Sequence, residues 1–142
     1  TADIVEDLAA DPISPYAAAK LAGEYYCRAF AGSFGLETVC LRYFNVFGPR
    51  QNPASQYAAA IPAFVTNILR GDPPLVYGDG EQTRDFIYVG DVSRTVATAC
   101  LSDEGNGLVA NLDTGRQTSI NRLARTIIDL CGSAVCLPPI AP

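Results

Sequence analysis

The stretch that decides the fold is residues 14–44, SPYAAAKLAGEYYCRAFAGSFGLETVCLRYF, in which a helix pattern is followed by a strand pattern. Residues 16–33 are rich in alanine, begin after a Ser-Pro pair and end near Gly32 and Gly35, as helices commonly do. Residues 37–44 then form an apolar run typical of a buried strand. A helix followed directly by a buried strand indicates half of a βαβ unit, so the sequence predicts an α/β fold with a parallel sheet.

The rest of the chain continues this alternation of helices and strands. Three further helices are expected, over residues 58–70, 91–101 and 119–131, with Asp91 and Ser119 as caps. Three further strands are expected, over residues 75–77, 83–89 and 108–112. Residues 78–80, GDG, begin like a dinucleotide-binding glycine motif, but a strand pattern follows where that motif needs a helix. We therefore interpret them as a turn between two strands.

The composition limits the classes of function. The chain has 142 residues, of which 49% are hydrophobic and 18% charged, as expected of a globular domain. Its net charge of −5 argues against a general nucleic-acid surface, and no apolar run is long enough to predict a membrane span. The chain contains no histidine, which excludes a Ser-His-Asp triad or a His-ligated metal site within it. Its five cysteines are interpreted as small core residues of a reducing compartment, which predicts a cytoplasmic location.

The first candidate for catalysis is a tyrosine–lysine pair at the start of the helix. Tyr16 and Lys20 are four residues apart and therefore project from the same face. An ordinary tyrosine is protonated at neutral pH because its pKa is about 10, and a nearby cation favours the phenolate. Such a tyrosine can accept or donate a proton. The alternative for this pair alone is an ordinary contact on the helix surface.

Two further polar residues stand where a ligand could bind. Asn45 follows the predicted strand 37–44, and ligands of parallel sheets bind outside the carboxyl ends of strands. Its amide can donate and accept, although capping of the following turn is an equal alternative. Arg84 follows a glycine turn, and a guanidinium there can clamp a diphosphate. The alternative for Arg84 is a surface pair with Asp85 or a similar pair, which would contribute little stability. Residues 111–115 form another strand end with a polar turn.

Taken together, these motifs resemble the extended short-chain dehydrogenase/reductase family, in particular its nucleotide-sugar epimerases of the UDP-glucose and UDP-N-acetylglucosamine 4-epimerase type. The matching segments agree with that family in order and spacing: SPYAAAK at 14–20, RYFNVFGPRQ at 42–51, YGDG at 77–80 and TRDFIYVGDV at 83–92. The resemblance implies a Rossmann-type sheet that holds NAD and a smaller C-terminal region for a UDP- or dTDP-sugar. Residues 1–48 would end the Rossmann part, and residues 49–142 would supply mainly the substrate region together with returning sheet strands.

The resemblance also implies a role for single residues. Tyr16 would be the catalytic base, and Lys20 would bond the nicotinamide ribose and favour the Tyr16 phenolate. The residues implied to bind NAD are Tyr16, Lys20, Tyr43 and Phe44. The residues implied to bind the sugar nucleotide are Asn45, Gln51, Ala59 and Arg84. The small side chain of Ala59 would leave room for an N-acetyl group, and no metal is expected.

The resemblance further implies a homodimer, because helix 16–33 packs at a two-fold interface in that family; intrachain packing of this helix is the alternative. No nucleic acid or membrane partner is expected. The chain opens at Thr1 in a polar stretch, so we interpret it as a piece of a longer protein that is inactive and poorly folded alone. The family's glycine-rich phosphate loop and catalytic Ser or Thr would precede Thr1, and its late arginine would follow Pro142.

Three departures from the family pattern occur at Ala19, Gly90 and Asp113, and none touches a proposed catalytic atom. Two related activities stay open, a dTDP-hexose 4,6-dehydratase and a UDP-glucuronate decarboxylase on the same scaffold. A different class is a non-catalytic, NAD-binding scaffold or RNA-binding relative. Such relatives tend to lose the Tyr/Lys pair or the substrate arginine. The presence of Tyr16, Lys20 and Arg84 therefore favours an enzyme.

Overall fold

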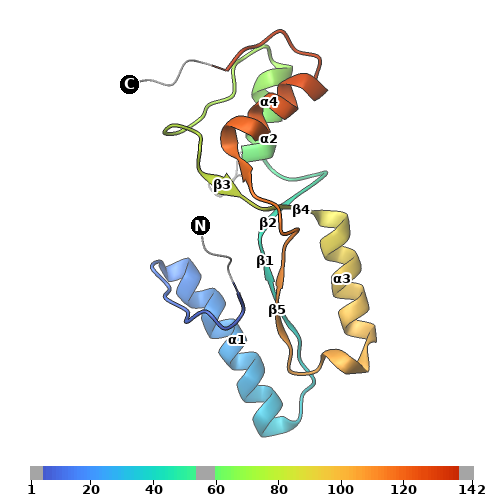
Figure 1. Cartoon of the computed structure of the whole chain (residues 1–142). Helices are drawn as coiled ribbons and strands as arrows, with labels where there is room; N and C mark the ends of the chain where they lie inside the picture. Colours follow the sequence, from blue (N-terminus) through green and yellow to red (C-terminus); the bar gives the residue numbers. More distant parts are fainter. Residues whose placement is uncertain (1–4, 54–59, 138–142) are drawn as a thin grey trace. The chain divides into compact units, whose positions relative to one another are not determined.

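Two compact units make up the chain in its computed structural model, which describes residues 5–53 and 60–137 (Figure 1). The first unit combines Thr1–Tyr43 with Val92–Leu112, and the second combines Phe44–Asp91 with Asp113–Pro142. Each unit is therefore built from two segments that are far apart in the sequence. We expect the Rossmann part to end and the substrate region to begin near residue 48. This boundary stays a prediction, because the two compact units are divided at other residues.

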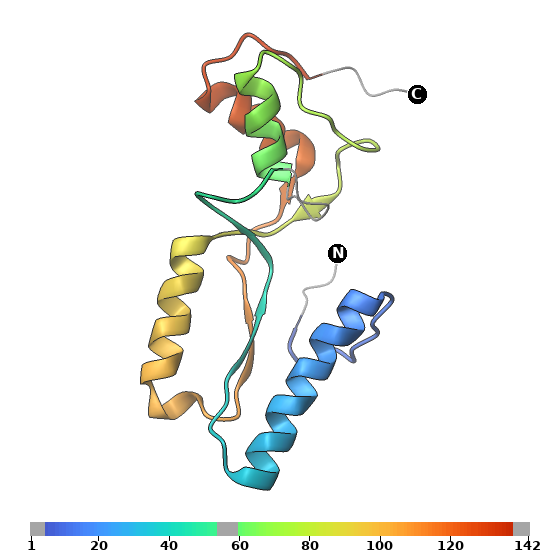
Figure 2. The ribbon, with the colours of Figure 1, turned by 180° about the vertical axis from the view of Figure 1, so that it is seen from behind.

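The first unit is a pair of parallel strands between two helices. Strand β1 (Cys40–Tyr43) pairs in parallel with β5 (Val109–Leu112), with Cys40 opposite Val109. Helices α1 (Pro15–Phe34) and α3 (Val89–Leu101) lie on opposite sides of this strand pair (Figures 1 and 2). A short 3-10 helix, η1 (Asp103–Gly105), leads from α3 towards β5. The parallel pairing confirms the α/β prediction made from residues 14–44.

Helix α1 begins and ends as its sequence predicts. Ser14 has extended backbone and its hydroxyl accepts a hydrogen bond from the Ala17 N–H at 3.1 Å, while Pro15 takes the first helical position. The helix ends at Gly35, whose φ of 67° is the left-handed conformation that glycine adopts at little cost. The Ser14 cap fixes the start of the helix, and therefore the positions of the side chains in its first turn.

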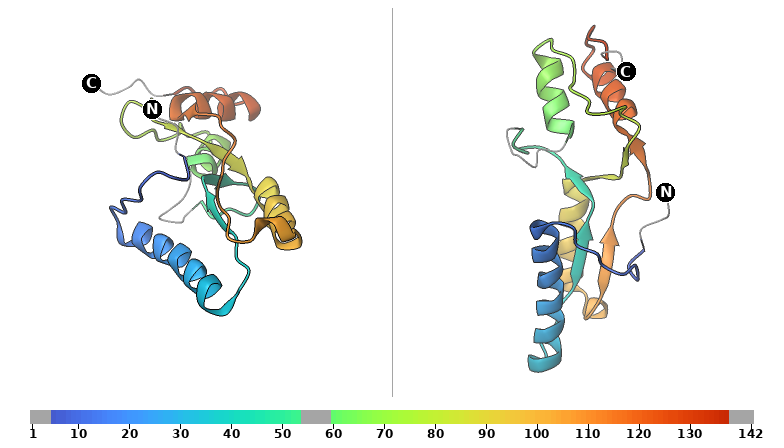
Figure 3. Two further views of the ribbon diagram at one scale, coloured as in Figure 1. Left: turned by 60° about the horizontal axis from the view of Figure 1, so that its bottom comes forward. Right: turned by 90° about the vertical axis from the view of Figure 1, so that its left-hand side faces the viewer.

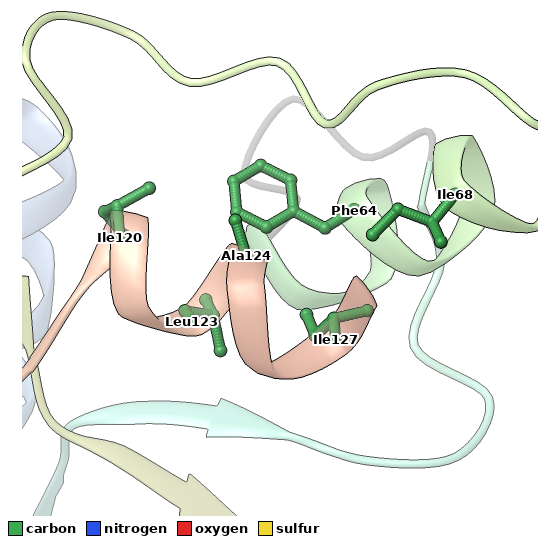
Figure 4. Close-up of a cluster of buried hydrophobic side chains, with 6 residues drawn as sticks. All are labelled: Phe64, Ile68, Ile120, Leu123, Ala124 and Ile127. Carbon is green, nitrogen blue, oxygen red and sulfur yellow. The ribbon is translucent and has the colours of Figure 1, made fainter. Parts of the chain in front are cut away.

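Over its described residues, the second unit contains four short strands and two packed helices. Strand β2 (Asn45–Phe47) pairs in parallel with β4 (Phe86–Tyr88), and β3 (Thr83–Arg84) pairs antiparallel with β6 (Thr118–Ser119). Helix α2 (Ala60–Leu69) lies beside α4 (Ile120–Leu130), as both views in Figure 3 show. The buried side chains between these helices form the core of this unit (Figure 4): Phe64, Ile68, Ile120, Leu123, Ala124 and Ile127.

The expected strand at 75–77 is not formed. This segment follows Pro73 and Pro74, and proline cannot donate to a strand ladder. Leu75 and Tyr77 are exposed while Val76 packs against the α2–α4 core, so their alternation reflects an extended loop laid on that core. The following glycines form a turn as predicted. The Asn121 N–H donates to the Gly80 carbonyl at 3.0 Å, so this turn lies against the start of α4.

The expected strand at 83–89 is divided into β3 and β4 by Asp85, whose side chain is buried. Helix α3 then begins at Val89, so Asp91 lies in its first turn and is not its cap, contrary to the prediction. Ser119, in contrast, caps α4 as predicted, because its hydroxyl accepts from the Arg122 N–H at 3.2 Å.

All five cysteines are free thiols. The prediction that they are core residues is wrong for Cys100 and Cys136, which are exposed, while Cys27, Cys40 and Cys131 are half-buried. Over residues 5–53 and 60–137, no helix combines the length and apolar character needed to cross a membrane.

Candidate active site

The structure brings Tyr16 and Lys20 together on the first turns of α1. The Lys20 Nζ atom lies 5.4 Å from the centroid of the Tyr16 ring, within the range of a cation–π contact. Tyr16 is 59% exposed, so this pair can be reached by a ligand. The Tyr16 hydroxyl can donate and accept a proton, and the Lys20 ammonium places a positive charge on the same helix face. The pair can therefore take part in proton transfer.

Helix α1 is attached to β1 by an ion pair between Glu24 and Arg42. The Arg42 Nε and Nη2 atoms donate to the two carboxylate oxygens of Glu24, each at 2.8 Å. This bond to Arg42 lowers the pKa of Glu24 below its ordinary value, and the same bond raises the pKa of Arg42. A bidentate pair restricts orientation as well as distance, so it limits rotation of the helix that carries Tyr16 and Lys20.

Glu6 links the segment before α1 to both strands of the first unit. Its carbonyl accepts from Arg42 Nη1 at 3.1 Å, and its carboxylate accepts from the Asn111 N–H of β5 at 2.8 Å. The bond from Asn111 lowers the pKa of Glu6. Sequence reasoning did not predict these contacts, because Glu6 and Asn111 are far apart in the chain.

Tyr43 lies at the end of β1, on the strand face opposite Arg42. Successive side chains of a strand alternate between faces, and Arg42 reaches α1. Tyr43 shares the other face with Leu41, where both line a hollow of about 360 Å³ together with Val96 of α3. Phe44 follows as the link to β2. Binding of NAD by Tyr43 and Phe44 stays a prediction.

In the second unit, Asn45 begins β2 and is held by the backbone of Asp85. The Asn45 N–H and its Nδ2 atom both donate to the Asp85 carbonyl oxygen, at 3.1 and 2.9 Å. The alternative that Asn45 caps the following turn is not what the structure shows, because its amide bonds Asp85, the residue between β3 and β4. Its remaining amide hydrogen and its Oδ1 atom can still bond a ligand.

Gln51 lies in the turn after β2. Its Nε2 atom donates to the Val46 carbonyl at 3.3 Å, and its N–H donates to the Gly48 carbonyl at 3.4 Å. Its Oε1 atom is buried and has no hydrogen-bond partner among the residues that the structure describes. A buried acceptor without a partner costs free energy, and a ligand donor could satisfy it. Ala59, predicted beside it in the substrate site, lies outside the described residues.

Arg84 and Asp85 do not face each other as a surface pair. The exposed Arg84 side chain donates from Nη1 to the Thr83 carbonyl at 2.8 Å, while the Asp85 carboxylate points inwards and accepts from Thr114 and Arg116. The structure therefore excludes the alternative in which Asp85 neutralises Arg84. Asp85 is the site residue that sequence reasoning missed, and the only signal for it was its place in the TRDFIYV segment.

The chain is similar to known proteins in sequence. Residues 2–112 match the NAD dependent epimerase/dehydratase family. The chain is 40% identical over 113 residues to a putative UDP-glucose 4-epimerase of Methanocaldococcus jannaschii, which covers 80% of this chain and 36% of that protein. The chain therefore spans less than half the length of this relative.

Solved structures give the same result. The structure of a UDP-N-acetylglucosamine 4-epimerase from Methanobrevibacter ruminantium, in complex with UDP-N-acetylmuramic acid, superposes with a TM-score of 0.88 at 43% identity. That match covers 97% of this chain and 46% of the other. A UDP-glucuronic acid 4-epimerase from Bacillus cereus, in complex with UDP-glucuronic acid and NAD, gives a TM-score of 0.84 at 33% identity over 99% and 45% of the two chains. The expected Rossmann-type α/β class is thereby confirmed.

Proposed function

Because the chain belongs to the NAD dependent epimerase/dehydratase family, we propose that it forms part of a nucleotide-sugar 4-epimerase acting on UDP-N-acetylglucosamine or UDP-glucose. The observation that carries the proposal is the contact between the Lys20 ammonium and the exposed Tyr16 ring. This contact places a hydroxyl that can exchange a proton and a positive charge together on one helix. Asn45 and Arg84 provide the polar groups that a sugar diphosphate requires.

The residues present fit NAD as the bound cofactor. The phenol of Tyr16 and the ammonium of Lys20 are one helical turn apart and can bond the hydroxyls of a ribose. Tyr43 and Phe44, at the end of β1, would complete the contacts of this segment with the cofactor. When bound, NAD would accept a hydride from C4 of the sugar and later return it to the opposite face.

Tyr16 would move the proton that accompanies this hydride. As the C4–H bond breaks, the Tyr16 phenolate takes the proton of the 4-hydroxyl, and the C4–O bond becomes a carbonyl. After the 4-keto sugar turns over in the site, Tyr16 gives the proton back to the oxygen. The reaction is redox-neutral overall, so no outside oxidant is consumed.

Three residues of the second unit would hold the sugar nucleotide. Asn45 would use its remaining amide hydrogen or Oδ1, and Gln51 would use its buried Oε1 acceptor. Arg84 would contact the diphosphate, which a guanidinium can bind through two parallel bonds. Ala59 would leave space for the N-acetyl group of UDP-N-acetylglucosamine.

The test is epimerisation of both UDP-sugars by the full-length protein that carries this segment. We expect Tyr16→Phe to lower kcat by about 10²-fold or more, since it removes the proton acceptor. Tyr26→Phe is the matched control, because Tyr26 lies on the same helix and is also exposed. Full activity in Tyr16→Phe would contradict the proposed mechanism, and a 4-keto-6-deoxy or decarboxylated product would assign a dehydratase or decarboxylase instead.

The isolated 142-residue chain serves as a second comparison. We expect it to be inactive, because the residues that it contributes supply only part of a cofactor and substrate site. Measurable epimerisation by this chain alone would refute that expectation.

A further inference from the structure

Asp85 is a buried charged residue whose carboxylate is fully engaged by one loop. The side chain is only 8% exposed. Its two oxygens accept from the Thr114 N–H at 3.1 and 3.0 Å, from the Thr114 hydroxyl at 2.8 Å and from the Arg116 N–H at 2.9 Å. All of these donors belong to the segment that precedes β6. A buried carboxylate held by backbone N–H groups restrains the segment that donates them.

The backbone of the same residue holds Asn45. The Asp85 carbonyl oxygen accepts both the Asn45 N–H and the Asn45 side-chain Nδ2, at 3.1 and 2.9 Å. This double contact sets the orientation of the Asn45 amide and leaves one of its hydrogens and its Oδ1 for a ligand. Any movement of the Asp85 backbone is therefore transmitted to the Asn45 side chain.

A small hollow adjoins this cluster in the second unit. It has a volume of about 430 Å³ and is lined by Phe86, Thr114, Arg116 and Thr118. Two of these residues, Thr114 and Arg116, are those whose N–H groups the Asp85 carboxylate binds. A third, Phe86, is the next residue along the chain from Asp85. One residue therefore bonds both the Asn45 amide, through its carbonyl, and two of the residues that line this hollow, through its carboxylate.

We propose that Asp85 is a positioning residue for the sugar nucleotide: its carboxylate fixes loop 114–116, and its carbonyl thereby presents the Asn45 amide to the ligand. The inference rests on the proposed function, in which Asn45 binds the sugar nucleotide. The carboxylate of Asp85 is engaged by Thr114 and Arg116 and its carbonyl by Asn45, so we infer that Asp85 acts on the ligand through Asn45. Its effect is expected on ligand affinity and only weakly on the proton transfer at Tyr16.

The first measurement is the Kd of UDP for the full-length protein, by calorimetry, for wild type and Asp85→Asn. The substitution keeps the shape of the side chain but replaces one acceptor oxygen by an N–H₂ group, which faces the N–H donors of loop 114–116. We expect the Kd of UDP and the KM of the UDP-sugar to rise about tenfold, while kcat changes less than threefold. Asp113→Asn is the matched control, because Asp113 Oδ1 accepts only the local Gly115 N–H at 2.8 Å and asparagine can do the same.

A double-mutant cycle separates positioning from a general loss of structure. If Asp85 acts through Asn45, Asp85→Asn will weaken UDP binding markedly in the wild type but little further in Asn45→Ala. Loss of folding would instead weaken binding equally in both backgrounds. If Asp85→Asn does not fold, Thr114→Val removes only the hydroxyl bond to Asp85 and is expected to raise the Kd of UDP two- to threefold.

The outcomes distinguish this inference from the proposed function. If the wild type binds UDP and Asp85→Asn binds it with the same Kd, the inference is overturned but the proposed function is not. The same holds if the effects of Asp85→Asn and Asn45→Ala on UDP binding are additive. Binding of UDP with the expected coupling, but without epimerisation of any UDP-sugar, supports the inference and contradicts the proposed reaction. Absence of UDP binding by the wild-type protein overturns both.

Discussion

Arg42 in β1 donates two parallel hydrogen bonds, each 2.8 Å long, to the carboxylate of Glu24 in α1. These two side chains are 31% and 21% exposed, respectively. The pair joins the helix that carries Tyr16 and Lys20 to the strand that ends at Tyr43. The positions of Tyr16 and Tyr43, the proposed base and a proposed cofactor contact, thus depend on the pair of Glu24 and Arg42. Glu24 is about two helical turns from Tyr16.

Replacing Arg42 by lysine is expected to destabilise the protein. Lysine keeps the charge but cannot form the two parallel bonds to Glu24. We expect a loss of about 1 kcal/mol in the free energy of unfolding, because the pair is only partly shielded from solvent. The measurement is urea unfolding of the full-length protein. Arg125→Lys, at an exposed position on α4, is the control, and equal losses in the two variants would contradict a specific role for the pair.

The same pair predicts a pH dependence of stability. Its bond to Arg42 lowers the pKa of Glu24 from an ordinary value of about 4.5 in the folded state. As the pH falls, the unfolded state therefore binds a proton at Glu24 more readily than the folded state does. The stability that Glu24 contributes is present above its ordinary pKa and is lost as the pH falls through its lower pKa in the folded state. Urea midpoints measured from pH 6 to pH 3 will fall less steeply for Glu24→Gln than for wild type. Parallel curves for the two proteins would show that Glu24 is not a source of this dependence.

Gly48 is predicted to be sensitive to a single added methyl group. A Cβ atom at this position would collide with Val89 Cγ1 and lie 3.1 Å from Val89 Cβ, both at the start of α3. We expect Gly48→Ala to cost about 1–3 kcal/mol of stability, as overpacking of a close contact does. Adding Val89→Ala removes the obstructing methyl groups and is expected to restore the part of that loss that comes from the clash, while the cost of the Gly48 φ of 159° for alanine stays. A double variant as unstable as Gly48→Ala would contradict the steric explanation.

Cys40 is expected to react slowly for a cysteine. Burial raises its pKa above the ordinary value, and the neighbouring Cys27 thiol acts in the same direction. Less of the reactive thiolate is therefore present at any given pH. At pH 8, iodoacetamide should modify the exposed Cys100 well before Cys40, as followed by peptide mass spectrometry. The difference should disappear in 8 M urea; if it persists there, the local sequence and not the fold is its cause.

Local chemistry explains which elements could be predicted. The cap at Ser14, the stop at Gly35 and the cap at Ser119 depend on residues within a few positions, and all three are confirmed. The strand predicted at 75–77 is wrong because alternation of exposed and buried residues also arises where an extended loop crosses a core. A strand additionally requires a partner with free hydrogen-bonding groups, which the local pattern does not report.

In the candidate site too, contacts between residues close in the sequence could be predicted and contacts between distant residues could not. The contact between Tyr16 and Lys20 could be predicted, because helical periodicity alone brings residues four positions apart onto one face. The role of Asp85 could not, since its partners Thr114 and Arg116 are about thirty positions away in the sequence. Because the Asp85 carboxylate is buried and bonds loop 114–116, it does not pair with Arg84 at the surface. The Asp85 carbonyl bonds Asn45 instead.

By itself, the sequence determined the family, the alternation of helices and strands, and the tyrosine–lysine pair on one helix face. These depend on residue types at short spacing, where the geometry of the backbone is known in advance. The tertiary structure alone decided that Glu24 holds Arg42, that Asp85 holds both Asn45 and loop 114–116, and that Gln51 keeps a buried acceptor without a partner among the described residues. The reason is physical: a buried polar group bonds whichever donor the fold brings near, and separation along the chain does not reveal which donor that is.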